Sequence, residues 1–258
     1  RIPIHDTHEY EWLTVSEIVK YSSNIGAAKI MQTMGRDVFY RQLKIFGFGE
    51  LTGIDCPGEV DGRLAHHRLW RPIDAANLAF GQGVAVTAMQ LATAVAAIAN
   101  DGVMMRPYIV QAITAPNGRL LKKTVPQPIR RAISVDTARA LRHMMAAVVE
   151  EGGTGTNAAI SGYKVGGKTG TAQKIGPDGR YSSSAFVSSF VGFAPVYNPK
   201  TVVLVVVDEP SKRHYGGTVA APAFKKIAQD TLGYMNVPPS LPRPRLEAAT
   251  PLIKKARL

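Results

Sequence analysis

The chain has 258 residues, of which 45% are hydrophobic and 19% charged, so it can bury a sizeable core, most simply as one domain plus a tail. No apolar run approaches the roughly 18 residues that a membrane-spanning helix needs. The net charge of +12 comes from basic residues spread along the chain, which favours a solvated surface over a nucleic-acid interface. Attraction to anionic lipid headgroups or wall polymers is the other open explanation of this charge.

Cysteine and histidine usage predicts no metal and no cofactor. The single cysteine, Cys56, excludes an internal disulfide and a cysteine-based metal site, and we expect it as a small buried filler in a turn. The six histidines give no metal-ligand pattern beyond His5 and His8, which lie in an expected loop.

Two short helices are expected near the start of the chain. Thr14 and Glu17 form a capping-box pair that opens a helix toward Lys20. A second helix is expected over residues 25–34, because Gly35 ends its pattern. The Ser-Ser-Asn step at 22–24 therefore falls in the connection, where a side chain can project into a cleft.

Three further helices are expected in the middle of the chain. One follows Asp37 and ends at Gly47, and the alanine-rich residues 87–100 form another without a polar face, which should be buried. Residues 135–150 carry apolar side chains at three and four spacing and end at a glycine pair.

The last third of the chain changes to strand-like periods. Residues 164–174, 188–196 and 201–207 are joined by turns and predict an antiparallel meander, with a helix over 222–232 packed on it. The run VVLVVV at 202–207 does not alternate, so we expect both its faces to be covered and the strand to be central in the sheet. Because nothing in the chain supplies its other neighbour, we also expect the strand to have an unfilled edge or a partner from another chain.

These elements predict an α/β fold of the α+β type, an antiparallel sheet flanked by helices. We place one domain at residues 1–236 and expect the basic, proline-rich tail at 237–258 to be disordered.

A Lys-Thr-Gly-Thr run at 168–171 has the chemistry to hold a substrate carboxylate on a strand. Lys168 supplies a positive charge, and Thr169 and Thr171 point to one face because side chains alternate along a strand. Gly170 has no side chain to keep a substrate backbone away. A strand of this kind also offers backbone donors to a developing oxyanion.

Ser22 and Asn24 have the residue types that would complete such a site. A hydroxyl near a departing amine can relay a proton, and an amide can pair with the peptide groups of a substrate. We therefore expect Ser22 and Asn24 to lie beside Lys168 and Thr171, with polar atoms within about 10 Å of one another.

Two other motifs match in letters only. Gly162, Gly167, Lys168 and Thr169 fit the pattern of a phosphate-binding loop, but no buried strand precedes them and no helix is expected to follow. Ser161 and Lys164 spell Ser-x-x-Lys, but Gly162 between them disfavours the helix that would place both side chains on one face, so we interpret the segment as a turn.

The Ser-Ser-Asn and Lys-Thr-Gly-Thr motifs, with several longer stretches, resemble the class B penicillin-binding proteins, the division and sporulation type of peptidoglycan D,D-transpeptidase. The resemblance runs from about His5 to about Tyr234. The matching stretches are WLTVSEIVKYSSNIGAAKI (12–30), FGQGVAVTAMQLATAVAAIANDG (80–102), GGTGTNAAI (152–160), KVGGKTGTAQK (164–174), SSFVGFAPV (188–196) and DEP with YGGTVAAPAF (208–224).

The resemblance implies a penicillin-binding, serine β-lactamase-like transpeptidase fold and a role for each motif residue. Ser22, Asn24, Lys168 and Thr171 would be catalytic, and Thr169, Gly170 and Thr171 would bind substrate. The hydroxyls of Thr169 and Thr171 would hold the substrate carboxylate, and the backbone N–H of Thr171 would form half of the oxyanion hole.

The sequence departs from the family at the nucleophile. In relatives the nucleophile serine and the lysine of the same Ser-x-x-Lys motif open a helix well before the second motif, which corresponds to Ser-Ser-Asn at 22–24. Only 21 residues precede Ser22 here. We therefore expect a transpeptidase domain incomplete on its N-terminal side, with no nucleophile and hence no activity in this chain alone.

The resemblance further implies partners and a location. The parent protein would cross-link D-Ala-D-Ala stem peptides of peptidoglycan, bind β-lactams, pair with the missing N-terminal segment and meet divisome or elongation proteins, but no nucleic acid. It would lie on the outer face of the bacterial cytoplasmic membrane, held by an N-terminal anchor. A non-catalytic scaffold and a penicillin-hydrolysing β-lactamase or sensor remain the alternatives.

Overall fold

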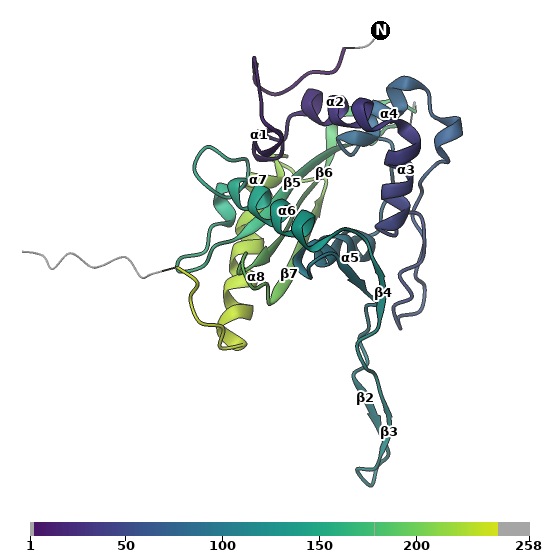
Figure 1. The fold of residues 1–258 in the computed structure, drawn as a ribbon, viewed down its shortest axis with the longest axis vertical. Helices are drawn as coiled ribbons and strands as arrows, with labels where there is room; N and C mark the ends of the chain where they lie inside the picture. The colour runs from purple at the N-terminus through teal and green to yellow at the C-terminus, as the bar shows by residue number, and fades with distance from the viewer. Residues whose placement is uncertain (1–2, 178, 242–258) are drawn as a thin grey trace, which may run out of the picture.

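The centre of the structure, a computed structural model that describes residues 3–177 and 179–241, is a three-stranded antiparallel sheet (Figure 1). Its strands are β5 (Gly166–Ile175), β6 (Tyr181–Ala194) and β7 (Thr201–Asp208), in the order β5-β6-β7. The predicted meander is confirmed, although β6 begins at Tyr181 rather than at Ser188. The register places Lys168 opposite Val191.

Helices cover both faces of this sheet (Figure 1). On one face α8 (Ala221–Tyr234) packs on a fully buried layer that contains Phe190 and Phe224, whose ring centroids are 4.7 Å apart. On the other face, α5 (Ala88–Ala99) and α6 (Val135–Ala147) pack against alternate residues of the strands. The predicted helices over 87–100, 135–150 and 222–232 are thereby confirmed within a few residues at their ends.

Strand β7 tests two expectations about the sheet, a central position and an unfilled edge. Val203 and Val205 pack toward α8 while Val202 and Leu204 pack toward α5, so both faces are covered along most of the strand. Within the described residues β7 pairs only with β6 and Val206 is 47% exposed, so the predicted unfilled edge is confirmed, and the strand is not central within the described chain. The apolar run fails to alternate because helices lie on both sides of the sheet, not because the strand has two neighbours.

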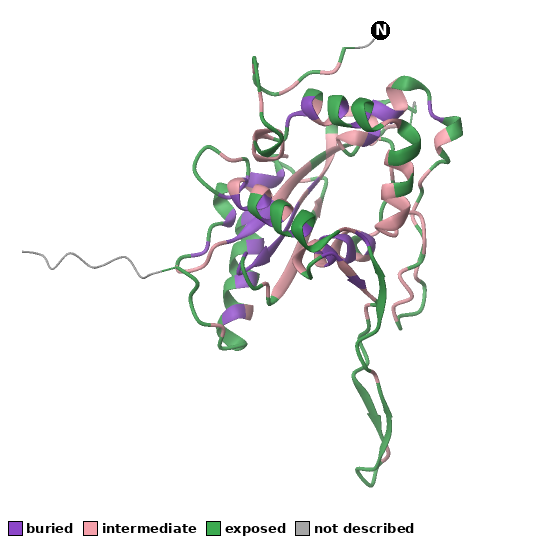
Figure 2. Cartoon of the chain, viewed as in Figure 1, coloured by how far each residue is buried: buried purple, intermediate pink, exposed green. Residues whose placement is uncertain are grey.

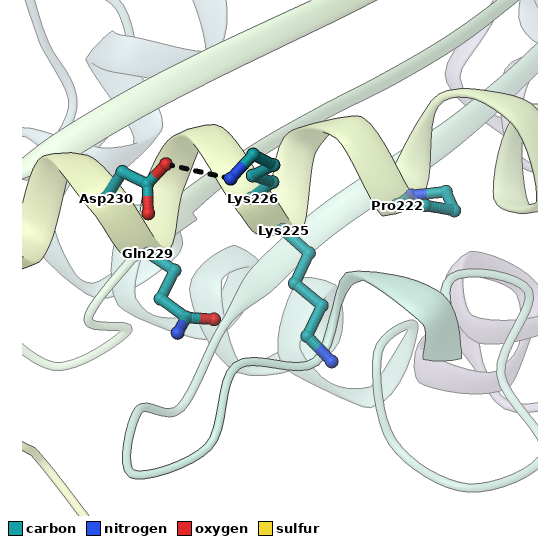
Figure 3. Close-up of a pocket in the computed structure, with 5 residues that line it drawn as sticks. All are labelled: Pro222, Lys225, Lys226, Gln229 and Asp230. Atoms are coloured by element: carbon teal, nitrogen blue, oxygen red, sulfur yellow. Dashed lines mark ion pairs between the residues drawn. The ribbon is translucent and has the colours of Figure 1, made fainter.

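The outer side of α8 carries a shallow, charged hollow (Figure 3). Pro222, Lys225, Lys226, Gln229 and Asp230 line it. Lys226 and Asp230 form an ion pair of 3.5 Å one turn apart, with both side chains largely exposed. A surface pair of this kind adds little stability. Because these polar side chains face solvent, this side of α8 is an ordinary solvated face.

A helical layer precedes the sheet in the chain (Figure 1). Its helices are α1 (Val15–Tyr21), α2 (Asn24–Met34), α3 (Arg36–Ile45) and α4 (Pro72–Ala79), with a short 3-10 turn at His67–Leu69 before α4. The Thr14–Glu17 capping box and the end of α2 at Gly35 are present as predicted. Trp70 is buried where α2 and α4 pack together.

A long two-stranded arm leaves the body below α5 (Figure 1). At its root β1 (Val103–Met105) pairs with β4 (Pro128–Arg131), and farther out β2 (Ala112–Thr114) pairs with β3 (Leu120–Lys123). Figure 2 shows the arm as exposed almost throughout. Nothing in the sequence pattern predicted it.

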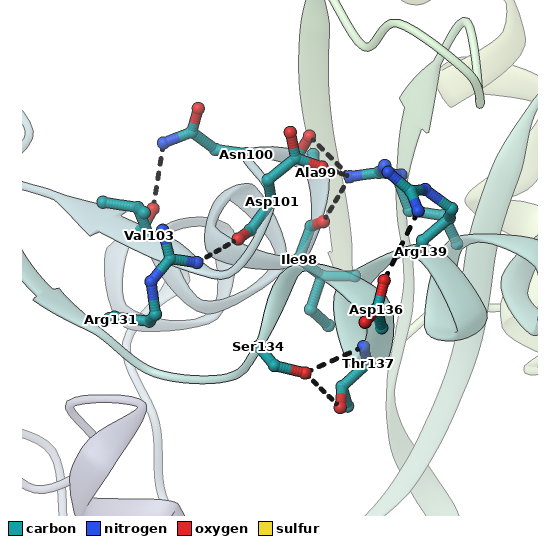
Figure 4. Close-up of polar contacts among 11 residues, drawn as sticks. Ile98, Ala99, Asn100, Asp101, Val103, Arg131, Ser134, Asp136, Thr137 and Arg139 are labelled. Carbon is teal, nitrogen blue, oxygen red and sulfur yellow. Dashed lines mark hydrogen bonds and ion pairs between the residues drawn. The ribbon is translucent and has the colours of Figure 1, made fainter.

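A buried arginine joins α5 and α6 next to the root of the arm. Arg142, with a side chain only 7% exposed, donates from Nη1 to the carboxylate of Asp101 at 2.7 Å and to the carbonyls of Ile98 and Ala99 at the end of α5. Figure 4 shows this corner, where Arg131 of β4 also donates to the Asp101 carbonyl at 2.8 Å. A cation at the C-terminal end of a helix meets unpaired carbonyls and the negative end of the helix dipole.

The structure also bears on the predictions for Cys56 and for the C-terminal tail. Cys56 is exposed, so its prediction as a buried filler is wrong: the turn that carries it lies on the surface. At the start of the predicted tail, the backbone N–H groups of Ser240 and Leu241 donate to the carbonyl of Gly162, and Val237 accepts from the Tyr163 hydroxyl. Residues 237–241 thus pack on the domain, and residues 242–258 lie outside the described part of the chain.

The remaining elements are short. They are a 3-10 turn at Thr156–Ala158 and α7 (Gly216–Val219), which lies over β5 and β6. No helix of the described chain is long and apolar enough to cross a membrane.

Candidate functional site

The second motif, Ser-Ser-Asn at 22–24, and the third motif, Lys-Thr-Gly-Thr at 168–171, lie next to each other in the folded chain. Lys168 Nζ donates to Ser22 Oγ at 2.6 Å, although 146 positions separate the two residues in sequence. This contact confirms the predicted juxtaposition of Ser22 with Lys168. Ser22 ends α1 with φ 58°, a left-handed conformation that is uncommon outside glycine, and α2 begins two residues later.

Burial changes the acid–base properties of Lys168. The side chain as a whole is partly exposed, but its ammonium group lies deep against the surrounding atoms, and this burial lowers the pKa of Lys168 to about 8. Its second contact is the carbonyl of Thr169, at 3.2 Å. No ion pair neutralises Lys168 within the described residues, so its charge is available to an anion.

Asp6 holds the turn that carries the second motif, a role that sequence reasoning missed. One carboxylate oxygen accepts from the backbone N–H groups of Asn24, at 2.6 Å, and Ile25, at 3.1 Å, while the other accepts from the Ser23 hydroxyl at 2.6 Å. Ser23 in turn caps α2 by accepting from the N–H of Gly26. A carboxylate at a helix N-terminus satisfies unpaired donors and favours the helix dipole.

The Asn24 side chain is engaged elsewhere in this structure. Its amide donates to the carbonyl of His5 at 3.0 Å, in the stretch before α1. The predicted proximity of Asn24 to Lys168 and Thr171 therefore stays a prediction.

The two threonines of the third motif contact a different part of the chain from Lys168. The hydroxyls of Thr169 and Thr154 lie 2.9 Å apart, and Thr171 Oγ1 accepts from the backbone N–H of Gly216 at 3.1 Å. Because Thr171 accepts with its oxygen, its own proton remains free to donate to an anion. Sequence reasoning gave no role to Thr154 or to Gly216, although both fall in stretches that carried the resemblance.

Two glycines allow this close approach. A side chain at Gly170 would meet the side chain of Ser189 on β6, and one at Gly216 would collide with the backbone of Ser189 and Gly170. Gly216 thus lets α7 lie directly against β5, which places its N–H at Thr171. Gly170, predicted to make room for a substrate, also has the Ser189 side chain of β6 beside it.

The two rival motifs are excluded by their conformations. Lys168 and Thr169 lie in the middle of strand β5, where no helix begins, so a phosphate-binding loop is ruled out. Ser161 and Gly162 lie in a turn in which Gly162 has φ 82°, and Lys164 forms an ion pair of 3.0 Å with Glu150. Ser161 and Lys164 therefore do not form a nucleophile and base pair on one helix.

Together, strand β5, its lysine and Ser22 bring a cation and a hydroxyl side by side on a helix-flanked antiparallel sheet. The family model described as penicillin binding protein transpeptidase domain matches residues 2–229. The chain therefore belongs to the penicillin-binding protein transpeptidase domain family, as the resemblance implied.

Curated relatives support the same assignment. The chain is 38% identical over 250 residues to the probable peptidoglycan D,D-transpeptidase PenA of Neisseria gonorrhoeae, covering 96% of this chain and 41% of that protein. It is 42% identical over 228 residues to stage V sporulation protein D of Bacillus subtilis, covering 88% of this chain and 35% of that protein. The chain thus spans about two-fifths of the length of the curated relatives it matches.

Solved structures confirm the fold class. The transpeptidase domain of penicillin-binding protein 3 from Burkholderia pseudomallei matches with a TM-score of 0.83 and 41% identity, over 93% of this chain and 70% of that one. Penicillin-binding protein 3 of Mycobacterium tuberculosis complexed with ampicillin matches with a TM-score of 0.85 and 35% identity, over 98% of this chain and 57% of that one.

Proposed function

We propose that this chain supplies the carboxylate-binding and proton-relay side of a serine D,D-transpeptidase site that cross-links peptidoglycan. The observation that carries the proposal is the contact between Ser22 and Lys168 beside strand β5, whose other edge is unpaired within the described residues. An extended stem peptide can add to such an edge as a further strand, with main-chain hydrogen bonds for affinity.

Each motif residue has a role in this proposal. The Lys168 ammonium attracts the terminal carboxylate of D-Ala-D-Ala, and the hydroxyls of Thr169 and Thr171 donate hydrogen bonds to it. Gly170 keeps the strand open to the substrate backbone, and the N–H of Thr171 receives the developing oxyanion. Asn24 pairs with the substrate's peptide groups.

Ser22 is placed to move a proton. Lys168 donates to its oxygen, so the Ser22 hydroxyl proton points away from the lysine and is free to pass to the departing amine of D-Ala. With a pKa of about 8, Lys168 can also replace that proton near neutral pH.

The nucleophile would come from a segment outside this sequence. Its only Ser-x-x-Lys, at 161–164, lies in a turn and is unsuited to the task. In the assembled site that external serine attacks the carbonyl between the two D-alanines, the terminal D-Ala leaves as a free amine, and a neighbouring stem amine then takes the acyl group. β-Lactams would acylate the same serine, and the relatives solved with ampicillin and aztreonam support this part of the proposal.

The proposed setting is the outer side of the bacterial cytoplasmic membrane, where the substrate is built into the wall. Division or elongation proteins are the partners proposed there, and the sporulation name of the Bacillus subtilis relative fits the division and sporulation type of transpeptidase.

A labelling experiment tests the proposal. A fluorescent penicillin is mixed with this chain alone and with the longer protein that carries the nucleophile segment, and adducts are located by mass spectrometry. The longer protein should form a stable, stoichiometric adduct on its Ser-x-x-Lys serine, and this chain alone none, because loss of the nucleophile in a serine hydrolase costs on the order of 10⁶ in turnover.

Three results would count against the proposal. An adduct on Ser22 or Ser161 of the isolated chain would show that the nucleophile is internal. Absence of an adduct in the longer protein would support a non-catalytic scaffold, and rapid deacylation would indicate a penicillin-hydrolysing enzyme.

A further inference from the structure

The arm formed by residues 106–127, with β2 and β3 near its end, has no core of its own. It projects from the body, and nearly every side chain along it is exposed (Figures 1 and 2). The exposed residues include large apolar ones that a solvated hairpin does not need: Ile109, Val110, Ile113, Leu120, Leu121 and Val125, between 41% and 66% exposed. An isolated two-stranded hairpin is at best marginally stable in water.

The root of the arm is nevertheless fixed. The Asp55 carboxylate accepts from the backbone N–H groups of Ile109 and Val110 at 2.6 and 3.0 Å, and these bonds hold the pKa of Asp55 below its usual range. Arg106 donates to the carbonyl of Gly53 at 2.7 Å. The arm is therefore presented from a defined position on the body.

The arm carries charge of one sign only. Residues 102–131 contain six basic residues (Arg106, Arg119, Lys122, Lys123, Arg130 and Arg131) and no acidic one. Arg106, Arg130 and Arg131 bond to the body near the root. Arg119 and Lys123 form no ion pair within the described chain, so the outer part of the arm presents unneutralised charge beside exposed apolar side chains.

Both outer edges of the β2–β3 ribbon are open. Within the described residues these two strands pair only with each other, so each leaves a row of backbone donors and acceptors unpaired. Open edges of this kind are templates for another strand. We propose that the arm binds an acidic, extended segment of another protein, which adds to β2 or β3 as a further strand.

Two other occupants fit less well. A second copy of this chain would bring the basic side chains of one arm, such as Arg119 and Lys123, against the same side chains of the other, which disfavours pairing of two arms. An anionic lipid surface would suit the charge, but a ribbon with open edges cannot bury its apolar side chains in hydrocarbon without leaving backbone groups unsatisfied. An acidic strand would neutralise the basic side chains, cover the apolar ones and pair with the open backbone groups of the ribbon edge.

Peptide binding tests the proposal. The probe is a fluorescein-labelled peptide of about ten residues that alternates glutamate with valine, added to the full chain and followed by fluorescence anisotropy. We expect saturable binding that weakens at high salt and protects amides of β2 or β3 from hydrogen exchange. The same peptide with alternate backbone nitrogens methylated, which removes one row of donors, should bind about tenfold less tightly.

A matched pair of variants locates the site. The double variant Lys122→Glu, Lys123→Glu should lower affinity at least about tenfold, whereas Lys225→Glu, Lys226→Glu on the outer side of α8 (Figure 3) makes the same change in charge and should alter it less than about twofold. Because all four side chains lie on the surface, the variants should melt at nearly the same temperature as the parent chain.

Several results would overturn the proposal. Equal losses of affinity in the two double variants, or no effect of N-methylation, would show that the peptide binds only by nonspecific charge attraction. Binding of phosphatidylglycerol vesicles through Lys122 and Lys123 in the absence of peptide binding would assign the arm to a membrane. Dimerisation of the chain through the arm would assign it to self-association.

Discussion

The motif site, formed by Ser22, Lys168, Thr169 and Thr171, and the arm are built in opposite ways. In the motif site, Asp6 holds the turn next to Ser22 and Gly216 bonds to Thr171, above a sheet in which Phe190 and Phe193 are fully buried. In the arm the backbone is held at the root, and side chains face solvent. The contrast teaches that the positions of the motif side chains depend on packing beneath them, whereas an exposed ribbon can be held by a few backbone bonds at its root. Each prediction below tests that contrast.

The largest effect on stability is expected in the core under the motif site. Phe224→Ala should lower the free energy of unfolding by about 3–5 kcal/mol, because the ring is fully buried against Phe190 and its loss leaves a cavity. Ile113→Ala on the arm should change it by less than about 0.5 kcal/mol. Urea denaturation measures both, and comparable losses would mean that the arm packs on a core in solution.

Removal of the motif-site charge should affect activity more than stability. In the longer protein, Lys168→Ala should slow acylation by a fluorescent penicillin about 10²–10³-fold, because a preorganised charge is lost from the site. Lys164→Ala, which breaks the ion pair with Glu150 and a hydrogen bond with Tyr197, should stay within about threefold. Equal losses in stopped-flow measurements would show that the lysines act only by long-range steering.

The corner between the core and the arm should show an intermediate effect. Arg142→Ala removes a buried cation from three acceptors and should destabilise the protein by about 2–3 kcal/mol. Arg139→Ala, one turn away, breaks only an exposed 3.4 Å pair with Asp136 and should cost less than about 0.5 kcal/mol. Thermal unfolding of the two variants measures the difference. Equal shifts in Tm would show that the buried contacts of Arg142 stabilise the protein no more than the exposed pair of Arg139.

A smaller effect is expected from the residue that holds the second motif. Asp6→Ala should lower stability by about 1–2 kcal/mol, since three donors at the start of α2 lose their acceptor. In the longer protein it should also slow acylation, with partial rescue by Asp6→Asn. Faster hydrogen exchange at the Asn24 and Ile25 amides would report the loosened turn, and unchanged exchange would refute it.

The smallest effect is a pH dependence of carboxylate binding. Lys168 is charged below its pKa of about 8, so affinity of the longer protein for a β-lactam carboxylate should fall as the pH rises from 7 to 9, by up to about tenfold per unit above the pKa. Lys168→Arg should flatten the profile, because arginine stays charged. A wild-type profile that is flat over this window would place the carboxylate elsewhere.

The same lowered pKa has a consequence for stability. Between about pH 8 and 10.5 the unfolded chain binds a proton at Lys168 that the folded chain has released, so stability gains from this group as the pH rises through that window. The Lys168→Ala variant should lack this contribution, which urea denaturation at several pH values would measure.

Much of the fold was predictable because the interactions that determine it are local. The Thr14–Glu17 capping box, the glycine at 35 and the strand period around residue 168 each act within a few residues, and the structure has the corresponding elements. The residue types of the two motifs likewise indicated their chemistry. The contact between Ser22 and Lys168 was predicted from the motifs and the resemblance, and the structure contains it.

Tertiary structure decided what depends on distant parts of the chain. Asp6 and Gly216 become partners of the motif site only after folding, and no local pattern distinguishes them from other acids and glycines. The central position expected for β7 failed because an apolar run indicates whether the faces of a strand are covered, not whether its edges are paired. Its unfilled edge was expected only because the sequence offers no second neighbouring strand. The sequence alone determined the elements and the chemical groups of this protein, and packing between distant segments determined which groups meet and which, as on the arm, remain exposed.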